Sequence, residues 1–202
     1  MKRRQAGFTL VEMMVVVSII GILVTTAVVY MRPRPRPIDI ANRVGDLFRE
    51  ASRRAIALGP VRSDVVAALK SRARTQITAS PSGTSALPTI TFTLWRLQEG
   101  AIGHSDWIRI MAYTTDPKVS VVDWRTNVVA YTPGSPADWS TFATLCSPDG
   151  TCQPVTLFFR ANPPGTDCDP AASAPLQAVY DQCAKLAVMP LGGAITTRAD
   201  WN

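Results

Sequence analysis

The strongest constraint on what this chain can fold into is a predominantly apolar stretch near its N-terminus, from Phe8 to Met31. As a helix, with a rise of about 1.5 Å per residue, this stretch is long enough to cross a hydrocarbon core of about 30 Å. It carries one charged residue, Glu12, close to its start. An ionised side chain in a membrane helix is costly and is normally retained where something pairs with it. The stretch therefore predicts a membrane helix whose carboxylate has a partner.

A short basic leader precedes this stretch. Lys2, Arg3 and Arg4 favour a cytoplasmic start, so the chain beyond the helix is expected on the other side of the membrane. A secretory signal has an apolar region of about 7–15 residues followed by a small-residue cleavage site. The stretch here is longer and is followed by no convincing site, so any cleavage is expected elsewhere.

The residues Gly7-Phe8-Thr9-Leu10-Val11-Glu12 resemble the prepilin signal of type IV pilins and of type II secretion pseudopilins. The resemblance implies that a prepilin peptidase cuts after Gly7 and that Phe8 becomes the N-methylated first residue. It also implies that Glu12 pairs with the N-terminal amine of a neighbouring subunit in a filament. Such a pair agrees with the partner that a membrane carboxylate requires.

These features divide the chain into four expected parts. They are a leader at 1–7, a transmembrane and filament-core helix at 8–31, an Arg-Pro linker at 32–37 and a single head at 38–202. Proline removes a backbone donor and disfavours helix at the preceding residue, so the linker is expected to end the first helix in a polyproline-like conformation.

The charge of the chain is unevenly distributed. Of the formal net charge of +6, the three leader cations account for half. Residues 32–74 hold 11 basic against 4 acidic residues, a net of +7, whereas residues 75–202 hold 7 against 10, a net of −3. Such asymmetry suits contact with anionic lipid or nucleic acid, or subunit packing in a filament, and we favour packing.

A second helix is expected after the linker, with Asp39 as its cap and Gly59-Pro60 as its end. Its charged face places Asp46 near Arg49 and Glu50 near Arg54. A shorter third helix is expected from Ser63, as the cap, to about Arg72. The apolar face of the second helix has helical spacing, with Ile40, Val44, Leu47, Phe48, Ala51, Ala55 and Leu58.

Beyond Thr75 the pattern changes to short β-branched and aromatic runs separated by turn residues, which predicts an antiparallel sheet and hence an α+β head. The run 49–56 and the closing pair of strands around Gly192-Gly193 resemble the head of GspH/FimT-type minor pilins and pseudopilins. The expected strands contain residues 89–95, 107–113, 119–122, 128–131, 155–159, 186–189 and 194–197.

All four cysteines, Cys146, Cys152, Cys168 and Cys183, lie in this head. Outside the cytoplasm an even number of cysteines most simply forms disulfides, here two. Three pairings are open, and pairing Cys146 with Cys152 and Cys168 with Cys183 would close two local loops. A zinc site is disfavoured because the chain has no Cys-x-x-Cys pair and only one histidine.

Nothing in the sequence indicates catalysis, a metal or another cofactor. His104, beside Ser105 and Asp106, does not have the separation that a catalytic triad shows in sequence. Asp167 and Asp169 match no full calcium-binding loop, and we expect them to be solvated.

Tryptophans offer a further candidate for binding. Trp95, Trp107 and Trp124 lie in or next to expected strands, where a ring buried on a sheet face is the usual outcome. Trp139 and Trp201 lie in an expected loop and near the C-terminus, so one of them is a candidate interaction residue.

The resemblance implies a non-enzymatic minor pilin, stored in the bacterial inner membrane with its head in the periplasm and then inserted into a type IV pilus. Implied partners are other major and minor pilins, the prepilin peptidase, the inner-membrane assembly platform and, before assembly, membrane lipid. The alternatives are a type II secretion pseudopilin and a DNA-uptake minor pilin. For DNA, the C-terminal segment offers only Arg198, offset by Asp200.

Overall fold

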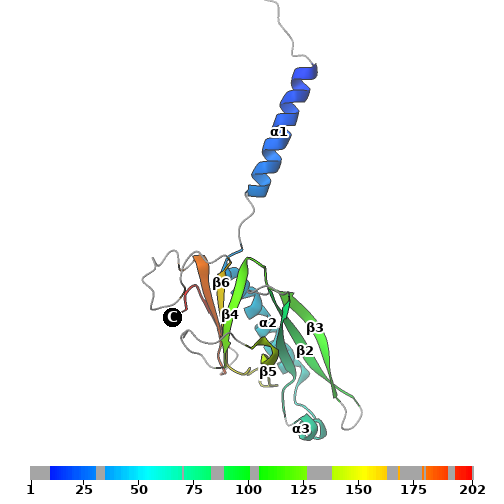
Figure 1. Cartoon of the computed structure of the whole chain (residues 1–202). Helices are drawn as coiled ribbons and strands as arrows, with labels where there is room; N and C mark the ends of the chain where they lie inside the picture. Colours follow the sequence, from blue (N-terminus) through cyan, green and yellow to red (C-terminus); the bar gives the residue numbers. More distant parts are fainter. Residues whose placement is uncertain are drawn as a thin grey trace, which may run out of the picture. The chain divides into compact units, whose positions relative to one another are not determined.

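The computed structural model describes residues 10–30, 35–69, 71–82, 89–100, 105–126, 138–162, 168, 179, 181–190 and 194–201. The chain divides into two units, Met1–Arg34 and Pro35–Asn202. The first contains helix α1 (Leu10–Tyr30), and the second contains the α+β head (Figure 1). The expected strand at 128–131 and the glycine pair at 192–193 lie outside the described residues.

Helix α2 (Pro37–Leu58) begins with a proline at its first position, where the missing N–H costs nothing, and Arg36 is its cap residue. The prediction that Asp39 caps the helix was wrong: Asp39 lies in the first turn. The predicted end was confirmed, since Gly59 follows the helix with φ 66°, a conformation that glycine adopts without strain. The predicted pairs on the exposed face are also present, with Arg49–Asp46 at 2.7 Å and Arg54–Glu50 at 2.6 Å.

Helix α3 (Ser63–Leu69) is shorter than predicted, and Ser63 is its first residue and not its cap. The carbonyl of Arg62 accepts the hydrogen bond from the Val66 N–H, which places Arg62 at the cap position. The expected helix ended near Arg72, but Arg72 lies in a loop before the first strand.

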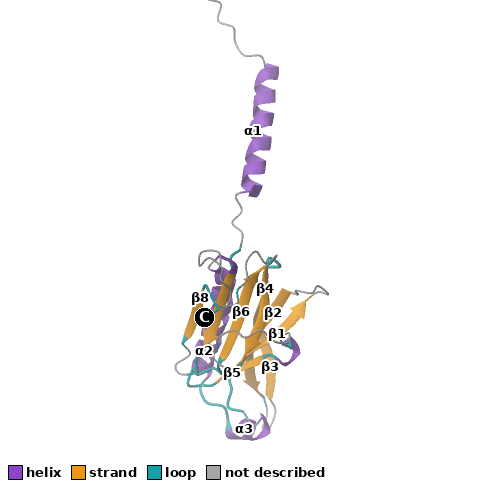
Figure 2. Ribbon diagram, turned by 60° about the vertical axis from the view of Figure 1, so that its left-hand side comes forward, coloured by secondary structure: helices purple, strands orange, loops and turns teal. Residues whose placement is uncertain are grey.

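Within the described residues, the strands form two four-stranded antiparallel sheets, not one, with the orders β3-β2-β1-β5 and β4-β6-β7-β8 (Figure 2). Helix α2 packs against strands of both sheets, mainly β7, β8 and β6 of one and β1 and β2 of the other. The bounds are β1 Thr75–Ser82, β2 Thr89–Glu99, β3 Ser105–Thr114, β4 Val119–Arg125, β5 Ala143–Cys146, β6 Val155–Ala161, β7 Cys183–Val188 and β8 Ile195–Arg198.

The main core lies between α2 and the two sheets. Buried residues of α2 include Phe48 and Val44, which join Phe92 of β2, Phe159 of β6 and Leu186 of β7 in one cluster. Among the predicted sheet tryptophans, Trp124 packs partly buried against this core, with its ring 5.2 Å from that of Phe142. Trp95 and Trp107 lie on strands as predicted, but their rings are half-buried.

The prediction that Trp139 or Trp201 is an interaction residue was wrong, because both are buried. Trp139 begins the short 3-10 helix η1 (Trp139–Thr141), is 8% exposed and meets Phe92 edge-on. Trp201 is 2% exposed and packs on Phe158, on the side of the second sheet that faces away from α2. Its Nε1–H donates to the carbonyls of Phe159 and Ala184, so the last described residue of the chain is part of the core.

The structure joins Cys146 to Cys152 and Cys168 to Cys183, with Cα–Cα distances of 4.0 and 5.8 Å. The first disulfide closes a turn whose Gly150 has φ 83° and lies against α2. The Ser52 hydroxyl of α2 donates to the Gly150 carbonyl at 2.7 Å. The disulfide loop is therefore attached to the helix as well as to strand β5.

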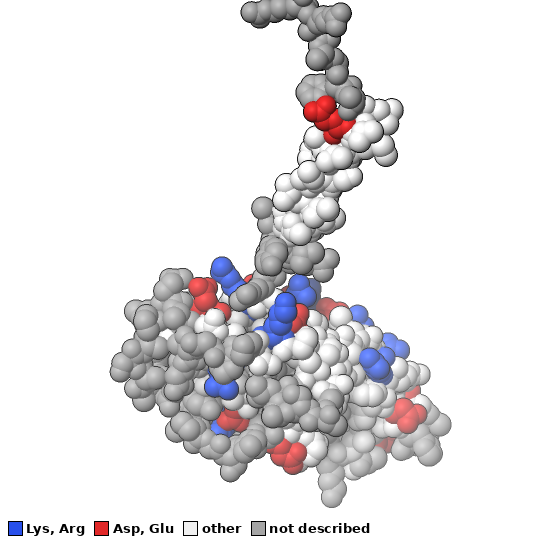
Figure 3. Space-filling view, turned by 45° about the horizontal axis from the view of Figure 1, so that its top comes forward, with Lys and Arg blue, Asp and Glu red and all other residues white. Residues whose placement is uncertain are grey.

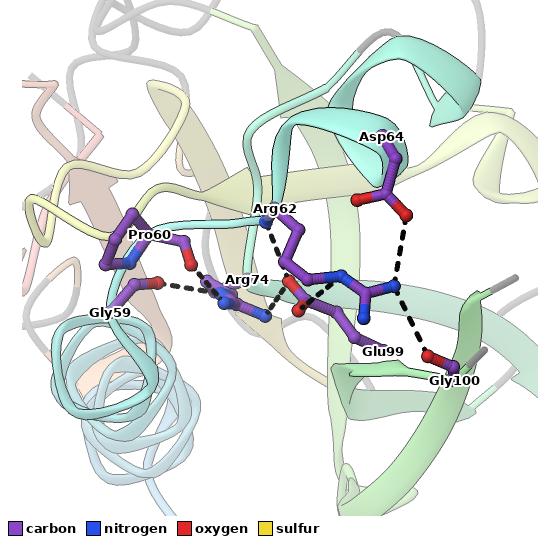
Figure 4. Close-up of polar contacts among 7 residues, drawn as sticks. All are labelled: Gly59, Pro60, Arg62, Asp64, Arg74, Glu99 and Gly100. Atoms are coloured by element: carbon purple, nitrogen blue, oxygen red, sulfur yellow. Dashed lines mark hydrogen bonds and ion pairs between the residues drawn. The ribbon is translucent and has the colours of Figure 1, made fainter. Parts of the chain in front are cut away.

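A buried ion pair closes the end of the head where α2 finishes (Figure 4). The Arg74 guanidinium, whose side chain is 8% exposed, lies 2.8 Å from the Glu99 carboxylate at the end of β2. It also donates to the carbonyls of Gly59 and Pro60, just after α2. Arg62 adds a backbone hydrogen bond to the same carboxylate. These contacts tie the turn after α2 to two strands of the first sheet.

Replacing Gly150 with alanine is expected to destabilise the head. A Cβ atom there would lie 2.7 Å from Cδ1 of Ile56, and the left-handed backbone costs a non-glycine residue about 1–2 kcal/mol. Urea denaturation of the full chain in detergent, followed by tryptophan fluorescence, measures the loss. Ile56→Ala, which truncates a side chain that is 55% exposed, is the control. The double variant is expected to lose less than the sum, and an unchanged midpoint for Gly150→Ala would contradict the prediction.

Replacing Arg74 with methionine is expected to cost about 3 kcal/mol or more, because it leaves the Glu99 carboxylate and two carbonyls without their buried donor. Arg62→Gln, at a side chain that is 42% exposed, is expected to cost less than about 1 kcal/mol. The same denaturation experiment compares them. Equal losses of unfolding free energy for the two variants would contradict the prediction that the buried Arg74 stabilises the head more than the exposed Arg62.

Candidate functional site

Helix α1 is the candidate functional element, because its surface does not suit water. Its 21 residues give a length of about 31 Å at 1.5 Å per residue. Every large apolar side chain described from Leu10 to Val28 is exposed, by 44% to 76%. This segment is long and apolar enough to cross a membrane, and none of it is buried within the chain. Figure 3 shows α1 as white on the visible side apart from acidic atoms near one end.

The serine and threonine hydroxyl groups of α1 are satisfied within the helix. Ser18 donates to the Met14 carbonyl at 2.8 Å, Thr25 to the Ile22 carbonyl at 2.8 Å and Thr26 to the Leu23 carbonyl at 2.9 Å. In hydrocarbon a polar group must find its partner inside the protein. Back-bonding to the preceding turn therefore lets the helix carry three hydroxyls into an apolar environment. Serine and threonine in the middle of the apolar run were the signal in the sequence from which these hydrogen bonds could have been predicted.

Glu12 is the acidic residue in the first turn of α1. Its carboxylate lies at the positive end of the helix dipole, where a negative charge is favoured. The other predicted processing residues, Gly7 and Phe8, lie outside the described residues, so the structure gives no geometry between them and Glu12. Of the predicted processing and assembly residues, the structure therefore describes Glu12, a carboxylate in the first turn of an apolar helix.

Comparison with protein families agrees with this arrangement. The family model of the prokaryotic N-terminal methylation motif matches residues 2–28, which contain the leader, Glu12 and most of α1. The chain is a type IV pilin-like protein. Such an N-terminus implies processing by prepilin peptidase, assembly with other pilins and anchoring in a membrane by α1. No curated protein and no solved structure matches the chain.

The ionisable groups of the pilin-like head have structural roles where their pKa values are shifted. Hydrogen bonds from the Ser140 hydroxyl and N–H lower the pKa of Asp138. Hydrogen bonds from Thr151 do the same for Asp149 in the first disulfide loop. Burial lowers the pKa of Lys185, and the nearby Arg198 lowers it further. These pKa shifts come from hydrogen bonds within turns and from burial in the packed head. None of the three identifies a pair of groups suited to acid–base catalysis.

Within the described ranges, no three histidine, cysteine, aspartate or glutamate side chains cluster as metal ligands. His104, Asp167 and Asp169 lie outside those ranges. All four cysteines are described and are bonded in pairs. The methylation motif indicates a structural, pilin-type protein.

A charge in the middle of α1 is expected to weaken membrane retention. Arginine at the centre of a membrane helix costs about 2.5–3.5 kcal/mol in insertion. With Ile20→Arg, a larger fraction of the full chain should leave the membrane pellet on alkaline carbonate extraction, whereas Ile20→Ala should remain with the wild type. Retention of the arginine variant at the wild-type level would contradict a membrane location for α1.

Proposed function

We propose that this pilin-like chain is a minor pilin that is incorporated into a type IV pilus and helps to prime its assembly. The observation that supports the proposal best is the exposed apolar surface of α1 together with Glu12 in its first turn. Large exposed apolar areas are rare on soluble monomers and are typical of membrane or protein contacts. A filament core of packed helices supplies such a contact.

Processing comes first in the proposed sequence of events. Prepilin peptidase cuts after Gly7, and Phe8 becomes the methylated first residue. The chain is held in the inner membrane by α1 with its head in the periplasm, in contact with lipid, until the assembly platform extracts it. The motif match at residues 2–28 supports the cleavage and methylation steps.

Glu12 gives the helix a register in the filament. In an apolar core, the carboxylate pairs with the new N-terminal amine of the neighbouring subunit. Removing one partner of such a buried pair typically costs about 3–5 kcal/mol, because the other charge is left unpaired. The pair therefore selects subunits whose helices are aligned with each other, beyond what apolar contact alone achieves.

The head is proposed to be of the GspH/FimT type. Support comes from the arginine-rich run at 49–56, which lies in α2 and whose Ala51 and Ala55 are buried in the core between the helix and the antiparallel strands. In the proposed filament this head remains outside the core, since the helix that leads to it is the part that inserts.

Glu12→Ala is expected to abolish assembly and leave processing intact. A strain deleted for this chain is complemented with wild type, Glu12→Ala or Asp46→Ala, and major pilin is measured in the sheared surface fraction. Wild type and Asp46→Ala should restore surface pilin, because Asp46 is a 72% exposed carboxylate on α2 outside the site. Glu12→Ala should not restore it, although mass spectrometry should find its N-terminus at a methylated Phe8.

Two results would overturn parts of this proposal. Unchanged surface pilin in the deletion strain would exclude the pilus role, and a simultaneous loss of type II secretion would identify a pseudopilin. An uncleaved chain in a strain with active prepilin peptidase would exclude the processing step and with it the whole assignment.

A further inference from the structure

Strand β3 is an exposed edge of the first sheet. It is the outermost strand in the sheet order, and among the described residues it pairs with β2 alone (Figure 1). None of its ten residues is buried, and Ile108 and Met111 are 37% and 42% exposed. The strand contains neither proline nor lysine, which commonly protect a sheet edge from pairing. A bulge at Ile110 interrupts its register with β2, so the regular part of the edge begins at Met111.

The direction of the backbone groups follows from a hydrogen bond at the end of β3. The Thr115 N–H donates to the Ile90 carbonyl of β2 at 2.9 Å. In an antiparallel pair, residues whose backbone groups point to the neighbouring strand alternate with residues whose groups point away. Thr115 points to β2, so Ala112, three residues earlier, and Thr114 point away from it. We call the side of β3 that carries these groups the outer edge.

The outer edge selects its occupant by the spacing of its backbone groups. N–H donors and C=O acceptors at the edge of a sheet are matched in spacing and direction by another extended strand. A lipid headgroup or a nucleic-acid backbone does not offer donors and acceptors that alternate with this repeat. The kind of partner that fits is therefore an extended polypeptide segment.

We propose that the outer edge binds β3 of a second copy of the chain, in antiparallel orientation, about a two-fold axis beside Ala112. In a two-fold interface the same surface of both copies is used, so Ala112 pairs with its own equivalent. An axis beside Thr114, the other outward residue, would pair the end of β3 with the turn that contains Pro117, which has no N–H to donate.

This register brings apolar side chains together on the core side of the sheet. Met111 and Tyr113 are the register partners of Leu94 and Phe92, which are buried core residues. Counted from the axis, Met111 of one copy lies opposite Tyr113 of the other, and symmetry repeats the contact. Met111 is exposed and Tyr113 is half-buried in the single chain. Sulfur–aromatic contacts of this kind are favourable.

The same register also brings opposite charges together. Ala112 and Arg109 pair with Thr93 and Trp95, so the two lie on one face of the sheet despite the bulge between them. Arg109 is exposed, and in the dimer it lies beside the end of the second copy's β3, which is followed two residues later by Asp116. Opposite charges on neighbouring strands stabilise their pairing, and symmetry makes this contact twice.

A disulfide at the axis tests the register. All four native cysteines are bonded in pairs, so Ala112→Cys adds the one free thiol. In a hydrogen-bonded antiparallel pair the Cα atoms are about 5.5 Å apart, within the range that a disulfide spans. The full chain in detergent, oxidised with copper phenanthroline, is expected to give a dimer on a non-reducing gel. Thr114→Cys is the matched control, because its equivalents lie about 13 Å apart along the strands and are expected to stay unlinked.

Dissociation of the dimer is measured by sedimentation of the full chain in detergent. Ala112→Pro removes an outward N–H and leaves the bonds to β2, so it is expected to raise the dissociation constant at least tenfold with a near wild-type urea midpoint. If that variant fails to fold, the charges decide: Arg109→Glu and Asp116→Arg should each weaken the dimer several-fold, and their combination should restore it. Arg53→Gln, 72% exposed on α2, should change nothing.

Three results would overturn the proposal. They are a wild type that sediments as a monomer, equal cross-linking of Ala112→Cys and Thr114→Cys, and a dimer that neither Ala112→Pro nor Arg109→Glu weakens. Cross-linking of Ala112→Cys in cells to another pilin, and not to itself, would overturn the second copy as the occupant. None of these readouts uses surface pilin or cleavage after Gly7, so failure here and failure of the assembly role are distinguishable.

Discussion

The head depends on burial of one side of helix α2. Apolar side chains along that side contact strands from both sheets, and without the helix the inner faces of both sheets would be open to water. The contact is close: a Cβ atom on Gly45 would lie 3.3 Å from Cδ1 of Leu186 and 3.4 Å from Cγ2 of Ile195. Because Gly45 has no side chain, the helix backbone approaches β7 and β8 closely. Burial of the apolar surface between the helix and the strands is the main favourable term in folding.

The helices were the part of the fold most open to prediction. The spacing of apolar residues in α2 identified both its existence and its buried side, because a helix of this length repeats its pattern several times. Its start was misassigned, since Asp39 is a good capping residue by type but a proline two residues earlier already occupies the first helical position. The fixed φ angle of Pro37 at the first helical position outweighed the capping preference of Asp39.

The strands were harder to predict for identifiable reasons. Strand β1 contains threonine, serine and Pro81, and its side away from α2 is neutral and polar, so it lacks the apolar run that marks a strand. Strand β5 has four residues and is held by pairing with β1 and by the disulfide next to it. Division into two sheets depends on which strands pair across long connections, and a single sequence holds little information on that.

The candidate site shows the same contrast. The apolar run alone predicted α1, and Glu12 was identified as the charged residue within that run. Neither signal depends on contacts with distant residues. Trp139 and Trp201 were misjudged because their burial comes from residues far away in the sequence, such as Phe92 and Ala184. The position of β3 at the edge of its sheet also required knowledge of the strand order.

Trp201 also constrains how the head forms. Its indole closes the outer side of β6 and β7, and Thr197 of β8 bonds Asn42 of α2, 155 residues earlier, at 2.7 Å. Contacts between such distant parts of a chain form late and slowly. Helix α2 packs against strands that come much later in the chain, so it is uncovered in the nascent chain until the segment from β7 to Trp201 has been made.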